Sequence, residues 1–379
     1  MKSSKPQFVG KKVTIGELGK TQSGGTPSSK HPEFFNGSIP WIGTTALNGK
    51  FLGKNDAVKL ITEEAVAKSA TKIVPEKSIM VGIRVGVGKV AINAVPMCTS
   101  QDIVSIVGID EASWNKEYIS LALQYKAPLL AAQAQGATIA GITSKTLKAI
   151  EIPAIPINEQ NRVVDILRKL ENQVGFVRKQ LCGLDALVKS RFVEMFGTPD
   201  NNIHSLPIKT MGEISEQLIA GGDKPRKISK NKDLKHPYPV FANGTIADGL
   251  QGFSEEARVN KSAVTIAARG TIGFCLVREP GFTPVVRLIS LVPKPSINVV
   301  YLKYFIDLLN LAGSGSSQAQ LTLPAFREQQ ILVPELKEQL EFSTFVAQVD
   351  KSRFVGMLHL LNSLSGIMHA SFFSVADTD

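Results

Sequence analysis

One glycine-rich stretch, from Gly82 to Ala91, has spacings close to those of two kinds of nucleotide-binding loop. The segment Gly86-Val-Gly-Lys-Val-Ala has the GxGxxA pattern of a dinucleotide loop, but that loop must open a helix. Here it leads into Val90-Ala-Ile-Asn-Ala-Val-Pro, which is typical of a strand. The stretch does not match an ATP-binding P-loop either. Five residues rather than four separate Gly82 from Gly88-Lys89, and Val90 stands where the P-loop has a metal-binding Ser or Thr. We therefore expect no nucleotide at this turn.

Other catalytic chemistry is also missing from the sequence. The five histidines lack the spacing of a metal site, and no suitably spaced Glu-x-Lys follows Pro199-Asp200 to complete a nuclease motif. The chain does not contain the Asn or Asp followed by Pro-Pro-aromatic that methyl transfer to a base amino group requires. The sequence thus predicts no catalytic residue, no metal ligand and no cofactor in this chain, and favours a binding protein.

The positive charge of the chain indicates the class of its ligand. The 379 residues carry 43 Lys and Arg against 33 Asp and Glu, a net charge of +10, which favours a polyanion without separating DNA from RNA or an anionic membrane. One loop, which also contains Gly221, Gly222 and Pro225, concentrates this charge in Lys224, Arg226, Lys227, Lys230, Lys232 and Lys235. Such a loop suits phosphate contacts, although a merely solvated basic loop would have the same composition.

Two arginines occupy matching turns. Arg84 and Arg269 each stand four residues before a glycine, Gly88 or Gly273. Arginine can bridge O6 and N7 of guanine, but in such a turn it can equally hold a loop or a phosphate. Weaker candidates for contacts with such a polyanion are the polar loop residues Ser28, Lys30, Thr44, Thr45, Asn48, Lys89, Thr138, Ser144, Lys145, Asn243, Ser317 and Gln318. Trp41 is expected in the core rather than stacked on a base, since its counterpart Val240 cannot stack.

An internal repeat of about 180 residues organises these candidates. Val13-Thr-Ile-Gly-Glu-Leu returns as Ile208-Lys-Thr-Met-Gly-Glu-Ile, and the helical stretch at Tyr118 returns at Tyr301. Short β-rich runs such as Ile103-Val-Ser-Ile-Val are broken by Gly, Pro and Asn. The pattern predicts an α+β fold with two related mixed α/β domains.

A long helix is predicted after each domain, from Glu159 to Phe196 and from Glu335 to Phe373. The first has apolar residues alternately four and three apart, a narrow stripe that faces a partner helix over about 40 Å. These residues are Val163, Leu167, Leu170, Val174, Val177, Leu181, Leu184 and Val188. The second repeats the stripe at Phe342, Val346, Val349, Phe354, Met357, Leu361, Leu364, Met368 and Phe372. Equal seams favour one intramolecular coiled coil over two unrelated amphipathic helices.

These features divide the chain into four segments. Gly197 and Pro199 predict a stop after the first helix. We expect a first domain over 1–157, a helix over 158–197, a second domain over 198–334 and a helix over 335–379. The scattered Cys98, Cys182 and Cys275 suit free thiols in a reducing compartment, and no stretch approaches the roughly 18 apolar residues of a membrane span. The expected location is the cytoplasm, with no membrane contact.

Three phrases in this order are similar to a known family. They are Ser23-Gly-Gly-Thr-Pro-Ser followed by Gly37-Ser-Ile-Pro-Trp-Ile, then Ile152-Pro-Ala-Ile-Pro-Ile-Asn-Glu-Gln-Asn-Arg-Val, then Lys189-Ser-Arg-Phe-Val-Glu-Met-Phe-Gly. Along essentially its whole length the chain resembles the specificity subunits of Type I restriction-modification systems. The resemblance implies two target-recognition domains that each read half of a split site in double-stranded DNA. Their two helices would pair antiparallel about a pseudo-twofold axis and set the spacer.

The resemblance also implies partners. Two methyltransferase subunits, which carry S-adenosylmethionine, would dock on the helices, and motor-nuclease subunits, which use ATP and Mg, would join them. Candidate docking residues lie mostly off the apolar stripe, where solvation alone could also explain them: Arg162, Arg168, Lys169, Arg178, Lys179 and Arg191. The second half lacks the Gly-Gly-Thr-Pro opening, so we expect it to read a different half-site. The alternatives are a scaffold with two domains that bind other ligands and a self-sufficient modification enzyme.

Overall fold

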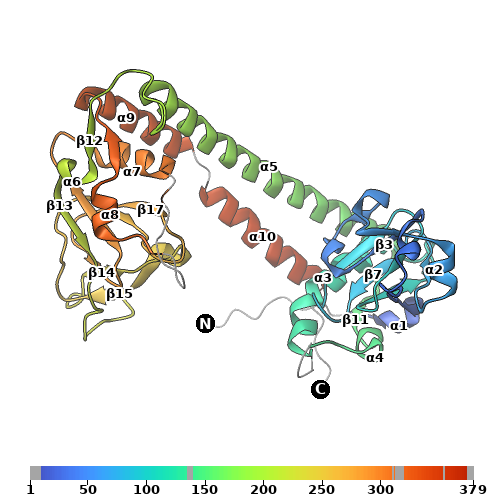
Figure 1. The fold of residues 1–379 in the computed structure, drawn as a ribbon. Coiled ribbons are helices and arrows are strands. Elements are labelled where there is room, and N and C mark those ends of the chain that lie inside the picture. The colour runs from blue at the N-terminus through green and yellow to red at the C-terminus, as the bar shows by residue number, and fades with distance from the viewer. Residues whose placement is uncertain (1–9, 135–139, 310, 312–319, 353–354, 374–379) are drawn as a thin grey trace. The chain divides into compact units, whose positions relative to one another are not determined.

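The computed structural model describes residues 10–134, 140–309, 311, 320–352 and 355–373 (Figure 1). The chain forms two compact units, the first from residues 1–178 with 356–379 and the second from 179–355. The helix α5 (Ile157–Phe196) contributes its first half to unit 1 and its second half to unit 2.

Unit 1 contains two main sheets. The larger has the strand order β2-β10-β7-β8-β4 and the smaller β5-β3-β9-β6. The helix α3 (Lys116–Ala132) packs against β8, and a two-stranded ladder joins β1 to β11. The strands are β1 (Lys12–Thr14), β2 (Lys20–Ser23), β3 (Ile39–Ile42), β4 (Phe51–Leu52), β5 (Lys59–Ile61), β6 (Ile73–Val74), β7 (Ile79–Gly82), β8 (Val90–Asn93), β9 (Met97–Thr99), β10 (Ile103–Val107) and β11 (Glu151–Pro153). The Gly86 turn therefore joins two strands, as the sequence predicted.

Unit 2 repeats this plan. Its main sheet has the order β13-β19-β16-β17, which corresponds to β2-β10-β7-β8, and the helix α7 (Val299–Leu308) packs on β17 and β16. A second sheet has the order β15-β14-β18, and β12 pairs with β20 as β1 does with β11. The strands are β12 (Ile208–Thr210), β13 (Ser215–Ala220), β14 (Tyr238–Phe241), β15 (Leu250–Ser254), β16 (Ala263–Ile266), β17 (Cys275–Arg278), β18 (Thr283–Pro284), β19 (Ile289–Pro293) and β20 (Gln330–Leu332). The predicted duplication of a mixed α/β fold is confirmed.

Short helices connect these strands in both units. They are α1 (Ile15–Leu18), α2 (Glu63–Ala67), α4 (Ser144–Lys148), α6 (Met211–Ile214) and α8 (Leu323–Arg327), with 3₁₀ turns η1 (Pro32–Phe35), η2 (Thr44–Ala46), η3 (Lys54–Asp56) and η4 (Ile246–Gly249). Thr143 and Thr322 cap α4 and α8 in the same way, since each side chain accepts a hydrogen bond from a first-turn backbone N–H. The repeat therefore extends to the helix caps.

The long helices pair antiparallel within each unit. In unit 1, Val163 and Leu167 near the start of α5 share a core with Phe373 at the end of α10 (Val355–Phe373). In unit 2, Val188 and Phe192 near the end of α5 share a core with Phe342 of α9 (Leu336–Ser352). Both ends of the predicted stripe on α5 thus lie in a helix seam, whereas Leu364, predicted in the second stripe, is 46% exposed. Phe354 and the side chain of Met357 lie outside the described residues.

Helix α5 ends where the sequence predicted. Gly197 takes a positive φ of 77°, and its N–H donates to the Val193 carbonyl at 2.8 Å. Glycine adopts this left-handed conformation without a Cβ penalty, which makes it an effective helix stop. Among the described residues, no helix combines the length and the apolar character needed to cross a membrane.

Candidate nucleic-acid interface

The basic loop of unit 2 starts from an anchored pair of glycines. The carbonyls of Gly221 and Gly222 accept hydrogen bonds from the N–H groups of Arg287 at 2.7 Å and Val286 at 2.9 Å. A Cβ on Gly221 would lie 2.6 Å from the Val285 nitrogen, so a side chain does not fit there. The loop is therefore fixed at its root to the turn that precedes β19.

The basic side chains of this loop are exposed. Lys224, Arg226, Lys227, Lys230, Lys232 and Lys235 are all solvent-accessible. Among the ion pairs of the described residues, Lys235 contacts Glu255 at 3.6 Å, whereas none includes the other five. Five cations on one loop are thus exposed and outside the ion pairs of the described residues, an arrangement that suits phosphate contacts.

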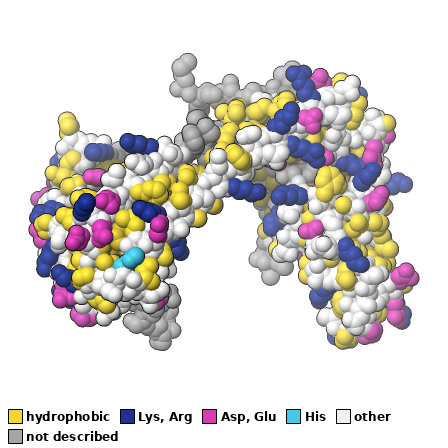
Figure 2. All heavy atoms as spheres, turned by 90° about the horizontal axis from the view of Figure 1, so that it is seen from above, with side chains coloured by type: hydrophobic (Ala, Val, Ile, Leu, Met, Phe, Trp, Pro, Cys, Tyr) yellow, Lys and Arg dark blue, Asp and Glu magenta, His cyan; other side chains and the backbone are white. Residues whose placement is uncertain are grey.

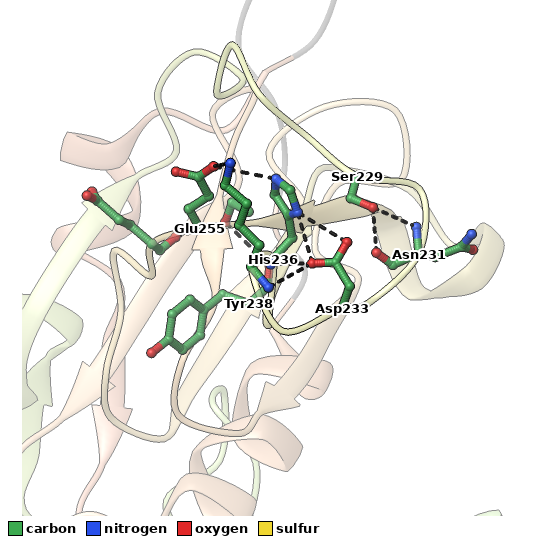
Figure 3. Close-up of polar contacts among 9 residues, drawn as sticks. Ser229, Asn231, Asp233, His236, Tyr238 and Glu255 are labelled. Atoms are coloured by element: carbon green, nitrogen blue, oxygen red, sulfur yellow. Dashed lines mark hydrogen bonds and ion pairs between the residues drawn. The ribbon is translucent and has the colours of Figure 1, made fainter.

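Polar contacts of Asp233, His236, Glu255 and Ser229 hold the shape of the loop (Figure 3). Oδ1 of Asp233 accepts from the N–H groups of Lys235 and His236 at 2.9 and 2.7 Å. The His236 ring lies between Asp233, at 3.0 Å, and Glu255, at 3.7 Å. The hydrogen bond from the His236 backbone is the main reason that the pKa of Asp233 lies below its usual range. Ser229 exchanges backbone hydrogen bonds with Phe253 of β15, which ties the middle of the loop to a strand.

Arg269 and Asn243 lie close to the root of the basic loop. Nε and Nη2 of Arg269 donate to Oε1 of Gln320 at 3.1 and 2.9 Å, and Arg287 donates to the same oxygen at 3.0 Å. Asn243 accepts from the Ala268 N–H at 2.8 Å and donates to the Val286 carbonyl at 2.6 Å. The prediction placed Asn243 among the DNA contacts, but its amide is engaged with the protein backbone on both sides. Its role in the structure is to join two loops.

Unit 1 has an equivalent glycine root. The N–H groups of Gly24 and Gly25 donate to the carbonyls of Ile103 and Thr99 at 3.1 and 2.8 Å. Gly221-Gly222 takes the same place in unit 2, although Asp-Lys-Pro follows it instead of Thr-Pro. The sequence comparison missed this match because it required the full Gly-Gly-Thr-Pro phrase. Trp41 is half-buried and donates to the Gly25 carbonyl at 3.0 Å, so it braces the root.

The candidates of unit 1 differ in exposure. Arg84 is half-exposed, and its Nη1 lies 3.9 Å from Oδ1 of Asp102. Asn48 is exposed, and the N–H of the next residue, Gly49, donates to the Val90 carbonyl beside the Gly86 turn. Other exposed candidates are Ser28, Lys30, Thr45, Lys89 and Lys145, whereas Ser144 is half-buried. Thr44 is only 7% exposed, so its side chain is not offered to DNA in this structure. Thr138, Ser317 and Gln318 lie outside the described residues.

The predicted docking residues on α5 fall into two groups. Arg168 pairs with Glu117, Arg178 approaches Asn362 at 3.5 Å and Arg191 pairs with Glu194 at 2.9 Å. The remaining three, Arg162, Lys169 and Lys179, are exposed. Apolar side chains accompany them on the same helix, with Phe176 58% and Leu187 50% exposed. Figure 2 shows Lys and Arg spread over the visible surface of both units, with hydrophobic side chains between them.

Comparisons with curated proteins give relatives of one kind. The putative type I specificity subunit S.MpnORF507P of Mycoplasma pneumoniae is 25% identical over 244 residues, 64% of this chain and 66% of that protein. The specificity subunit of the type I restriction enzyme EcoR124I/EcoR124II of Escherichia coli is 35% identical over 173 residues, 44% of this chain and 42% of that protein. Each alignment thus spans less than two thirds of the relative's length.

Solved structures share the fold. The type I S subunit from M. genitalium superposes with a TM-score of 0.59 at 17% identity, covering 97% of this chain and 96% of that one. The family model described as the Type I restriction modification DNA specificity domain matches this sequence twice, over residues 10–182 and 207–355. With two matched domains that together span most of the sequence, this chain belongs to the Type I restriction modification DNA specificity family.

Proposed function

We propose that this chain is the DNA-specificity subunit of a Type I restriction-modification complex. Its domains over 1–157 and 198–334 each read one half of a two-part site in double-stranded DNA, and its helices over 158–197 and 335–379 set the distance between the halves. The observation that carries the proposal is the duplication: two copies of one scaffold, each with a Gly-Gly root beside an arginine turn. Two readers on one chain suit a site with two parts.

The chain has no catalytic role in this proposal. Two methyltransferase subunits carry S-adenosylmethionine and the adenine chemistry, and motor-nuclease subunits use ATP and Mg in the cytoplasm. The methyltransferases dock on the long helices, where Arg162, Lys169 and Lys179 combine with exposed Phe176 and Leu187. Apolar side chains rimmed by cations are typical of a protein interface.

The proposal is tested with the full-length chain and the methyltransferase of its own system. We expect co-purification with two methyltransferase subunits per chain, measured by light scattering. The complex should bind duplex DNA with an affinity that falls steeply as salt rises, since phosphate contacts release counterions. A chain that purifies alone and binds no duplex at low salt would support the scaffold with other ligands instead.

A further inference from the structure

Two guanidinium groups in unit 2 converge on one neutral oxygen. Oε1 of Gln320 accepts from Nε and Nη2 of Arg269 and from Nη1 of Arg287, all within 3.1 Å. Of the ion pairs formed by the residues that the structure describes, none includes either arginine. Bringing two cations together without a carboxylate is unfavourable, so this arrangement is best explained by a ligand rich in acceptors.

One position beside the arginine turn is occupied by a carboxylate, Asp102, in unit 1 and by a cation, Arg287, in unit 2. Val104 pairs with Val81 in unit 1, and Ile289 pairs with Ile266 in unit 2. If these pairs are aligned, Arg84 corresponds to Arg269 and Asp102 corresponds to Arg287. Unit 1 therefore has an arginine and a carboxylate 3.9 Å apart, where unit 2 has two arginines. A shared position with different chemistry is what two readers of different half-sites require.

The hydrogen bonds to Gln320 leave Arg269 one free edge. A guanidinium has two edges with paired N–H groups, one formed by Nε with one Nη and one formed by the two Nη atoms. Gln320 takes the edge that contains Nε. The remaining Nη edge has the paired donors that fit O6 and N7 of guanine.

Backbone contacts hold both arginines in place. Asn243 binds the backbone of Ala268 and Val286, the residues immediately before Arg269 and Arg287. Val286 and Arg287 have positive φ values of 52° and 61°, a conformation that β-branched and long side chains rarely adopt. The hydrogen bonds from these two residues to Gly222 and Gly221 stabilise this turn. A strained turn that the surroundings hold firmly is typical of a functional site.

We propose that Arg269 reads a guanine in the half-site of the second domain, with Gln320 and Asn243 as positioning residues and Arg287 as the second cation of the site. This inference rests on the proposed function. Arg269 and Arg287 both donate to Oε1 of Gln320, which fixes the orientation of the Arg269 guanidinium. A fixed guanidinium edge suits a guanine better than a phosphate, because a phosphate contact does not require one orientation. A guanidinium locked on one side discriminates between bases, whereas a mobile one mainly supplies charge.

The test uses the full-length chain with its methyltransferase and measures methylation rates on duplexes that carry each of the four bases at every position of the site. For Arg269→Lys, we expect the preference for guanine at one position of one half-site to fall about 10-fold or more, with the other half-site unchanged. Arg269→Ala should do the same. The lysine variant keeps the charge, so it covers the case in which the alanine variant does not fold.

The positioning role has its own readout. Gln320→Leu removes the shared acceptor and should weaken the guanine preference at the same position, with an unchanged melting temperature. Lys230→Gln, in the basic loop, is the matched control and should slow methylation equally for all four bases. If Arg269→Lys leaves the guanine preference unchanged, or if Arg269→Ala slows methylation equally for all four bases, Arg269 contacts a phosphate and the inference is overturned. If the wild-type complex has no two-part site at all, it is the proposed function that fails.

Discussion

Gln160 and Gln339 make the same three hydrogen bonds in the two units. Each is fully buried near the start of a long helix. Oε1 accepts from the N–H of Asn115 or Asn298, the residue that caps α3 or α7, at 2.9 or 2.8 Å. Nε2 donates to two backbone carbonyls, those of Ser113 and Ile155 or of Ser296 and Pro334. The duplication thus holds at the level of single atoms, and one amide fastens each helix to the domain before it.

Replacing this amide should destabilise the unit that contains it. Gln160→Met keeps the size of the side chain but leaves one N–H and two carbonyls without their partner. Each unpaired buried group costs about 1–3 kcal/mol, so the loss of three partners should lower the free energy of unfolding of unit 1 by about 3 kcal/mol or more in urea denaturation. Gln173→Met, at an exposed position of the same helix, is the control and should change it by less than about 0.5 kcal/mol. Equal effects of the two changes would contradict this role.

The end of α10 should be essential for unit 1. The Phe373 ring is buried and lies 5.3 Å from the Tyr118 ring of α3. Phe373→Ala removes a large core side chain, which costs about 3–5 kcal/mol. We expect the thermal transition of unit 1 to drop and that of unit 2 to stay, as measured by calorimetry. Leu364→Ala, at a half-exposed position of α10, should leave both transitions in place. A stable unit 1 without this ring would be incompatible with the core described here.

The basic loop should contribute affinity without sequence preference. Lys230→Gln removes one exposed cation, so the slope of log K against log salt should fall by about 1 for target and non-target duplexes alike. Fluorescence anisotropy at several salt concentrations measures this slope. Lys209→Gln on β12, which is also exposed, serves as the control with an unchanged slope. An unaltered slope for Lys230→Gln would mean that the loop is only solvated.

Asp233 should hold the shape of that loop above acidic pH. Because the folded pKa is lowered, its stabilising effect is complete above the unfolded value of about 3.9 and is lost as the pH falls through the folded value. The backbone N–H groups of Lys235 and His236 donate hydrogen bonds to Asp233. At pH 7, Asp233→Ala should therefore speed hydrogen exchange at these two amides. Asp223→Ala, an exposed change in the same loop, should leave these rates unchanged. Exchange at the wild-type rate in Asp233→Ala would rule out this role.

One of the three thiols should react in the folded chain. Cys182 is exposed, whereas Cys98 and Cys275 are buried. Burial raises the pKa of both buried thiols, and the neighbouring Asp307 raises that of Cys275 further. We expect Ellman's reagent to label one thiol per native chain at pH 8, and none rapidly in Cys182→Ser. Fast labelling of a second thiol would show that a core is open.

Much of the scaffold could be predicted because it depends on local and periodic signals. The apolar spacing from Val163 to Val188 predicted the seam, and Gly197 predicted the end of α5. The Gly86 turn was assigned to a strand pair because the residues after it are β-branched and apolar. These features need only neighbours along the chain or one repeated period.

The candidate nucleic-acid interface was less predictable because it depends on contacts between residues that are far apart in the sequence. Arg287 could not be identified from the sequence, since no local signal indicates that Val286 and Arg287 adopt positive φ. Their turn forms only where β19 meets the Gly221 root. Likewise, Asn243 resembles any polar loop residue until Ala268 and Val286 are brought to its two sides. Alignment of the two halves through their strand pairing would have revealed the exchange of Asp102 for Arg287.

The central claim, that this chain directs methylation to a two-part site, is tested most directly by mapping methylated adenines. The map compares the genome of a host that expresses the methyltransferase with this chain and without it. We predict methylation at one motif of two short halves with a fixed spacer, present only when the chain is expressed. Methylation that is the same in both hosts, or that occurs at one uninterrupted motif, would contradict it.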